Sequence, residues 1–183
     1  MMQVTREERR AAVREGYQIL LRAKADLMLP CEKEGIAAYY SALADKCMEW
    51  ATEVHGEQLR KGFLSMEDTR ERARYGMQEY RLEMRCVWES DALAAILCES
   101  YLSGYPTRGE KSYHRLSHVW NLEEETILPA RQIMAEFGFC RMPKEVAFRP
   151  DGVYPEGDFL KFFKNPRGES PFEEIQIPIL FKN

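Results

Sequence analysis

The segment Tyr80–Trp88 alternates apolar and polar residues one by one. Tyr, Leu, Met, Cys and Trp occupy its even positions, and most of the odd positions between them carry charge. A side-chain period of two gathers one set on one face of a β-strand, whereas the period of 3.6 in a helix would scatter it. The segment is therefore predicted to be a strand with one buried face.

Three other segments show the same alternation. Leu93–Leu102 and Lys111–Leu122 follow it, separated by turn residues at 90–92 and by the loop Ser103–Glu110, which contains two glycines and a proline. Tyr17–Leu29 precedes it and ends at Pro30, which cannot donate to a strand ladder. Together these segments predict an antiparallel sheet.

The segment Glu32–Arg60 has a helical period, because its apolar residues recur three and four positions apart. Tyr40 and Trp50 lie on its apolar side and are large enough to bury about 150–250 Å² each against a sheet. This segment predicts one long amphipathic helix that packs on the sheet.

Shorter elements are predicted at both ends of the chain. Residues 1–16 combine a capping-box spacing with a terminal glycine and predict a polar N-terminal helix. Pro129–Phe137 predicts a second short helix, and Val146–Phe148 and Ile175–Leu180 predict edge strands. We therefore expect an α+β fold in a single domain over residues 1–183, with its core in residues 17–180.

Composition narrows the class of protein. The chain has 183 residues, 45% of them hydrophobic, which suits one domain with a substantial core. Its net charge of −4 provides no positive field for nucleic acid. It has no long uncharged apolar run, and its first ten residues run straight into charge, so we expect a cytoplasmic protein without membrane association.

The cysteines are predicted to be reduced and mostly buried. Their count is odd, no Cys-x-x-Cys occurs, and several lie in apolar-patterned segments: Cys31, Cys47, Cys86, Cys98 and Cys140. An odd loop after Glu89 would bring Cys86 near Ile96 or Cys98, where a disulfide is geometrically allowed. Two packed thiols are the state expected in a reducing cytoplasm.

The sequence contains no constellation that predicts catalysis. His114 and His118 would converge on a metal ion if they lay on a helix. On a strand they share a face but lie about 13 Å apart, at about 3.3 Å per residue, which is too far for one ion. No nucleophile elbow or glycine-rich phosphate loop occurs, so no catalytic residue, metal or cofactor is predicted.

Aromatic residues near the hairpin loop suggest a different role. Tyr101, Tyr105 and Tyr113 cluster around this loop, and Arg108 lies within it. Tyrosine and arginine are enriched in protein-binding surfaces. We therefore predict these four residues as a partner-binding site on a monomer, with Pro178 protecting the C-terminal edge strand from self-pairing.

The end of the third strand carries a motif, Trp120-Asn121-Leu122, followed by Thr126 and Leu128. This motif and the order of elements resemble the extracytoplasmic domain of RsiV-type anti-sigma factors, over about Tyr80–Leu180. The loop at Tyr101–Gly109 departs from that family's pattern, and the family's membrane helix is absent. The resemblance implies a degenerate, soluble, bacterial relative with a helix on an antiparallel sheet, and neither lysozyme sensing nor sigma-factor binding carries over.

Two functions are compatible with these observations, besides a purely structural or vestigial role. The first is a non-enzymatic bacterial module that binds or regulates another protein through the hairpin loop. The alternative is a small-ligand binder or enzyme with a pocket between the long helix and the sheet, which would use Glu99, His114, Arg115 and His118.

Overall fold

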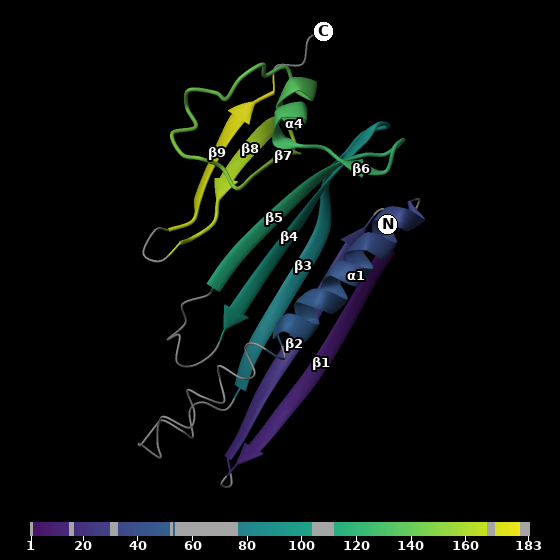
Figure 1. Cartoon of the computed structure of the whole chain (residues 1–183), viewed down its shortest axis with the longest axis vertical. Helices are drawn as coiled ribbons and strands as arrows, with labels where there is room; N and C mark the ends of the chain where they lie inside the picture. The colour runs from purple at the N-terminus through teal and green to yellow at the C-terminus, as the bar shows by residue number, and fades with distance from the viewer. Residues whose placement is uncertain are drawn as a thin grey trace.

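A computed structural model describes residues 2–14, 17–29, 33–51, 53, 77–103, 112–167 and 171–179. A six-stranded sheet forms its centre, with helix α1 on one face and a second, three-stranded sheet with helix α4 on the other (Figure 1). The first sheet contains β1 (Met2–Arg14), β2 (Tyr17–Leu29), β3 (Met77–Glu89), β4 (Leu93–Ser103), β5 (Ser112–Asn121) and β6 (Thr126–Ile127), in that order. The remaining elements are α1 (Glu34–Trp50), α4 (Ala130–Glu136), β7 (Gly152–Glu156), β8 (Phe159–Lys164) and β9 (Glu173–Pro178).

The strands predicted from alternation are confirmed as β2, β3, β4 and β5. The large sheet is nevertheless mixed, because β2 and β3 run parallel while its other pairs are antiparallel. Parallel neighbours require a long crossover connection. The connection from β2 to β3 contains α1, so the chain forms a β-α-β unit within an α+β fold.

The predicted N-terminal helix over residues 1–16 is wrong. Met2–Arg14 forms β1 and pairs antiparallel with β2, with Met2 opposite Leu29 and Arg14 opposite Tyr17. A capping-box spacing is a local preference, and pairing along a whole neighbouring strand overrides such preferences.

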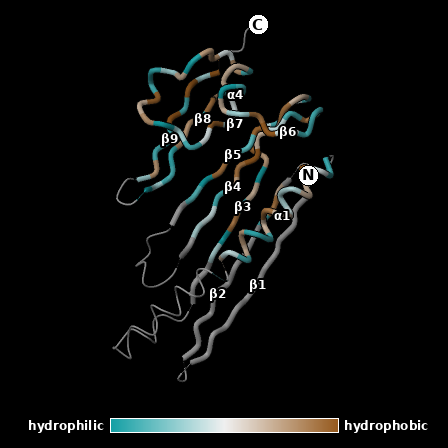
Figure 2. The backbone as a smooth tube through the Cα atoms, viewed as in Figure 1, coloured by the Kyte–Doolittle hydropathy of each residue, from teal (hydrophilic) through white to brown (hydrophobic). Residues whose placement is uncertain are grey.

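Strand β4 is the centre of the core because both of its faces are buried. Ala94, Ile96 and Cys98 face the cluster under α1, whereas Ala95 and Leu97 face the cluster formed with α4 and the small sheet. Figure 2 shows the hydrophobic stretches of β3 and β4 beside α1 and β7. The sequence of a strand that is covered on both faces is a continuous apolar run, as in Leu93–Cys98.

The predicted helix on the sheet is confirmed as α1, which contains 17 residues, Glu34–Trp50. The part of the prediction beyond residue 53 lies outside the described residues. Its buried stripe is Ile36, Tyr40, Ala44, Met48 and Ala51. The prediction of Trp50 as an inner anchor is wrong, because its side chain is 49% exposed. Trp50 lies two residues after the buried Met48, which places it about 200° from Met48 around the helix axis. Its ring meets the ring of Tyr80 edge-on.

A β-bulge in β3 moves Trp88 to the opposite face from the rest of its predicted set. The pairing changes from Cys86 opposite Ile96 to Trp88 opposite Ala95, and this one-residue shift reverses the side-chain direction. Trp88 therefore packs edge-on against Phe137 beside α4, with ring centroids 5.3 Å apart.

The C-terminal third contains more sheet than predicted. Val146–Phe148 is not a strand, and the predicted strand at Ile175–Leu180 is present as β9. Strands β7 and β8 were not predicted; they form a hairpin whose two-residue turn includes Gly157 at φ +57°. Among the described helices, none has the length and apolar character needed to cross a membrane.

Helix α4 confirms the predicted short helix. Pro129 precedes its first turn, and Gly138 follows its end at φ +84°. This left-handed conformation is unfavourable for residues with a Cβ atom.

We expect Gly138→Ala to lower the free energy of unfolding by about 1 kcal/mol for this reason. Urea denaturation measures the change, with Glu136→Ala on the exposed side of α4 as a control that stays near zero. Equal stability of the two variants would contradict the backbone argument.

Candidate functional site

The structure places two of the four predicted partner-binding residues next to each other. Tyr101 on β4 and Tyr113 on β5 are cross-strand partners, and the Tyr101 side chain is partly exposed. The other two, Tyr105 and Arg108, lie outside the described residues. The described part of the site is therefore the rung where the β4–β5 hairpin approaches its loop.

The next rung of the hairpin carries Glu99 and Arg115, which are also cross-strand partners. Strand β7 crosses the large sheet near this level: Gly152 approaches Ser117 on β5, and Glu156 pairs with Arg85 on β3 at 3.8 Å. Burial raises the pKa of Tyr101, with a further contribution from the Glu99 carboxylate.

Arg115 and Glu99 form the centre of a buried ionic cluster. The Glu99 side chain is 7% exposed and that of Arg115 12%. Arg115 donates to Glu99 Oε1 from Nε at 3.1 Å and from Nη2 at 2.9 Å, and Arg85 donates to the other carboxylate oxygen at 3.3 Å. Two guanidinium groups thus compensate one buried carboxylate, as a buried charge requires.

The same guanidinium connects the large sheet to the small one. Arg115 Nη1 donates to the Tyr154 hydroxyl at 3.0 Å and contacts the Glu174 carboxylate, while Tyr154 donates to Glu174 at 3.2 Å. The guanidinium carbon lies 4.7 Å from the Phe172 ring centroid and 5.5 Å from that of Phe163. Burial raises the pKa of Tyr154, so this hydroxyl stays protonated. Hydrogen bonds and cation–π contacts hold Arg115 between the two layers.

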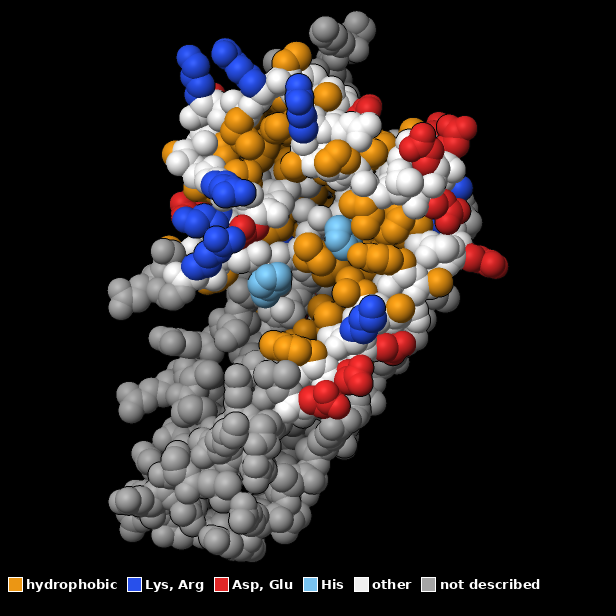
Figure 3. Space-filling model, in the orientation of Figure 1, with side chains coloured by type: hydrophobic (Ala, Val, Ile, Leu, Met, Phe, Trp, Pro, Cys, Tyr) orange, Lys and Arg blue, Asp and Glu red, His pale blue; other side chains and the backbone are white. Residues whose placement is uncertain are grey.

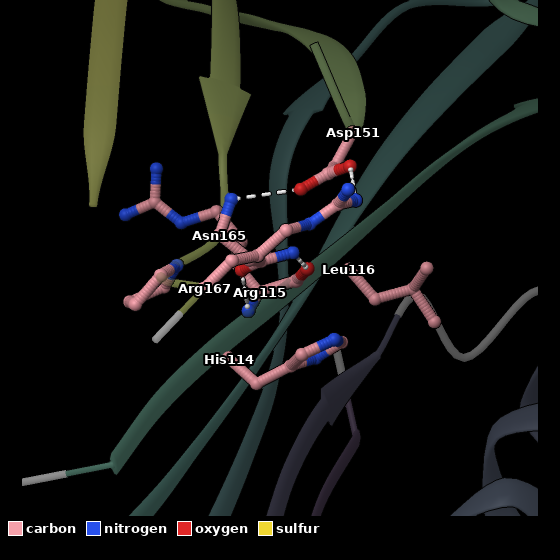
Figure 4. Close-up of a pocket in the computed structure, with 7 residues that line it drawn as sticks. His114, Arg115, Leu116, Asp151, Asn165 and Arg167 are labelled. Carbon is pink, nitrogen blue, oxygen red and sulfur yellow. Dashed lines mark hydrogen bonds and ion pairs between the residues drawn. The ribbon is translucent and has the colours of Figure 1, made fainter. Parts of the chain in front are cut away.

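A shallow pocket of about 270 Å³ lies at the outer edge of β5 (Figure 4). The Asn165 side-chain amide bonds both backbone groups of Arg115, accepting from its N–H at 2.7 Å and donating to its C=O at 2.9 Å. Asp151 accepts from the Asn165 N–H at 2.9 Å and pairs with Arg167 at 2.5 Å. Asn165 therefore takes the place of a neighbouring strand residue, which protects this edge of the sheet.

The two histidines of β5 lie on the face that carries α1. His114 is exposed and lines the pocket, whereas the His118 ring contacts Tyr40 on α1. Figure 3 shows the described histidines in pale blue, one of them surrounded by hydrophobic side chains. Glu99 and Arg115 face the opposite side of the sheet, so the four residues of the alternative hypothesis do not converge on one site. Ile36, Tyr40 and Ala44 fill the space between α1 and the sheet, each with no exposed surface.

The thiols near α1 are poor nucleophiles. Cys98 is 4% exposed, and burial raises its pKa to about 12. Burial also raises the pKa of Cys47 and Cys86. The described cysteines are all free. Cys86 lies opposite Ile96, which is one of the two neighbours predicted for it. Within the described ranges, no three His, Cys, Asp or Glu side chains converge as metal ligands.

We expect Cys98 to react with a thiol reagent at pH 8 at least about tenfold more slowly than the exposed Cys140, because the buried thiol forms little thiolate. Peptide mass mapping after timed labelling measures both rates in one sample. Comparable rates at the two positions would contradict the burial of Cys98.

Comparison with solved structures identifies the fold. The chain is similar to a DUF3298 family protein from Pseudomonas aeruginosa, with 12% sequence identity, 97% of this chain and 89% of that chain covered, and a TM-score of 0.54. A DUF3298 protein from Bacteroides fragilis aligns at 11% identity over 97% and 90% of the two chains, with a TM-score of 0.49. No family model matches the chain, and no curated protein matches it. The chain thus shares its α+β fold with a bacterial domain of unknown function.

Proposed function

We propose that this chain is a bacterial, cytoplasmic recognition module that binds another protein through the tip of the β4–β5 hairpin and catalyses no reaction. The observation that carries the proposal is the rung formed by Tyr101 and Tyr113, which lies beyond the Glu99–Arg115 pair on the way to the loop. Tyrosine offers a protein partner a large apolar surface with a polar end.

The chemistry of the other polar groups supports a binding role. Glu99 and Arg115 pair with each other, and Arg115 also donates to Tyr154 and contacts Glu174. The guanidinium groups of Arg115 and Arg85 both donate to the buried carboxylate of Glu99 and compensate its charge. Residues that would serve an enzyme are used here to join two layers of the fold.

Resemblance to RsiV-type anti-sigma factors supplies a precedent for recognition by such a domain, and we propose a distant, soluble relationship to them. A monomer is the proposed state, since β9 ends at Pro178 and Asn165 covers the outer edge of β5 at Arg115. Fold alone carries little information about function. The proposal therefore rests on the rung of Tyr101 and Tyr113.

Affinity capture from the native bacterium tests this proposal. The tagged chain should retain a stoichiometric partner that a Tyr105→Ala, Arg108→Ala variant loses. The matched control is Glu123→Ala, Glu124→Ala, which changes two exposed residues in the turn at the other end of β5. Retention of the partner by the tip variant would refute the assignment of the site.

The β5-edge pocket supports a second candidate function. Its Arg167 and His114 side chains offer donors to a small anionic ligand, and Asp151 orients the guanidinium. A thermal-shift screen of small carboxylates and phosphates, repeated with His114→Ala, Arg167→Ala, distinguishes this function: stabilisation lost in the variant would favour it over the recognition module.

A further inference from the structure

Three aromatic side chains form a hydrogen-bonded contact between α1 and the large sheet. Tyr40 on α1 is fully buried, and its hydroxyl lies 2.9 Å from both Trp120 Nε1 and His118 Nδ1 on β5. An indole nitrogen only donates, so the phenol oxygen accepts from Trp120. We assign the phenol proton to His118 Nδ1, which makes Nδ1 the unprotonated nitrogen of a neutral ring.

Ring packing reinforces this contact. Tyr39 meets the Trp120 ring edge-on at 5.3 Å and the His118 ring edge-on at 5.7 Å. Tyr40 lies 6.1 Å from Trp120 in the same type of arrangement. The Tyr39–Tyr40 pair near the N-terminal end of α1 is thereby held on β5, with the Tyr40 side chain and its bond to Trp120 buried and the His118 ring partly buried.

We propose that Tyr40, His118 and Trp120 form an acid-sensitive latch, which holds α1 on the sheet when His118 is neutral and releases it when His118 is protonated. A proton on Nδ1 turns the acceptor of the phenol O–H into a second donor. The buried hydroxyl of Tyr40 then has no acceptor for its own proton, and a buried donor without a partner is costly. The proposal concerns regulation of the fold and does not depend on the hairpin tip.

Titratable groups from several elements lie around the latch. Tyr39 on α1, Cys98 on β4 and Cys86 on β3 interact with Tyr40, and the Glu125 carboxylate lies against Gly35 in the first turn of α1. Burial raises the pKa of both thiols and of Tyr40, so these groups stay neutral. The cross-strand partner of His118 is the apolar Ile96.

The direction of the pH effect follows from burial, which lowers the pKa of His118 below its ordinary value of 6.5. A released or unfolded His118 therefore binds a proton more readily than the docked one. Above pH 6.5 the latch contributes its full stabilisation of the docked helix. Its contribution falls as the pH drops from 6.5 towards the lower pKa of the docked ring.

Thiol labelling of the full chain tests the latch, because Cys98 lies in the core under α1 whereas Cys140 is exposed. We use 4,4′-dithiodipyridine, which reacts in acid, and take the ratio of the Cys98 and Cys140 labelling rates. Cys140 corrects for the intrinsic pH dependence of the reagent. Between pH 7.5 and pH 5 the ratio should rise about fivefold or more, while far-UV circular dichroism stays unchanged.

Four variants separate the latch from general acid sensitivity. His118→Asn places a non-titrating oxygen at the Nδ1 position and should give a low, flat ratio. His118→Phe removes the acceptor and should give a high ratio at every pH, as should Tyr40→Phe, which leaves the Trp120 N–H without its acceptor. His114→Asn changes the exposed histidine of the same strand and should retain the wild-type response.

Two results would overturn the proposal. One is a flat ratio in the wild type across the range in which NMR shows His118 to titrate. The other is an acid response in His118→Asn equal to that of the wild type, which would place the sensitive group elsewhere. The NMR titration also reports the tautomer, and a proton on Nδ1 of the neutral ring would contradict the hydrogen-bond assignment.

Discussion

Arg115→Met is expected to lower the free energy of unfolding by about 3–5 kcal/mol, because it leaves a buried carboxylate without its main partner. Methionine preserves the length of the side chain but has no donor for Glu99, Tyr154 or Glu174. The cation–π contacts with Phe172 and Phe163 disappear as well. Urea denaturation followed by circular dichroism measures the change.

Arg85→Met is the matched control for this experiment. Arg85 contacts the same carboxylate, but its side chain is 42% exposed, so we expect a loss of less than about 1 kcal/mol. The double variant Glu99→Gln, Arg115→Met should recover part of the loss, since a neutral amide is cheaper to bury than a carboxylate. Equal effects of Arg115→Met and Arg85→Met would contradict the central position of Arg115.

Phe162→Ala is expected to destabilise the chain by about 3–5 kcal/mol. Phe162 is fully buried in the cluster that joins the small sheet to β4, β5 and α4. Truncation leaves a cavity at the contact between the two layers. Thermal and urea unfolding of the full chain measure the effect.

Phe159→Ala on the same strand provides the comparison, because Phe159 is only partly buried and should cost much less. If residues 1–183 form the predicted single domain, Phe162→Ala shifts one cooperative transition observed by every probe. A separate early transition of the small sheet would show two folding units.

The alternating strands were predictable because burial of one face places an apolar residue at every second position of the segment itself. Residues Tyr80, Leu82, Met84 and Cys86 keep their period of two and share the α1 face. Trp88 follows the same pattern in sequence but not in structure, since a bulge depends on the pairing with β4. Local patterns predict strands better than they predict how strands pair.

The first hairpin of the small sheet has a local signal in the sequence. Gly157-Asp158 between two apolar runs is a typical two-residue hairpin turn, and it predicts the β7–β8 hairpin. The β1 strand gave no such signal. Its charged sequence suits a polar helix, and only its pairing with β2 explains its conformation.

Predicting the ionic cluster requires the register of β4 against β5. Glu99 and Arg115 are 16 positions apart, and the antiparallel pairing of β4 with β5 places them on one rung. Tyr154 and Glu174 come from strands of the other sheet. No pattern along the chain links these four residues, so the sequence identified two of them without showing that they pair.

Site-specific photo-crosslinking tests the proposed recognition role most directly. A photoreactive phenylalanine analogue replaces Tyr105, between β4 and β5 in the sequence, in the native host, and the same analogue replaces Glu136 on the exposed side of α4 as the control. We expect one defined covalent adduct with another protein from position 105 and none from position 136. No adduct from position 105, or the same adducts from both positions, would contradict it.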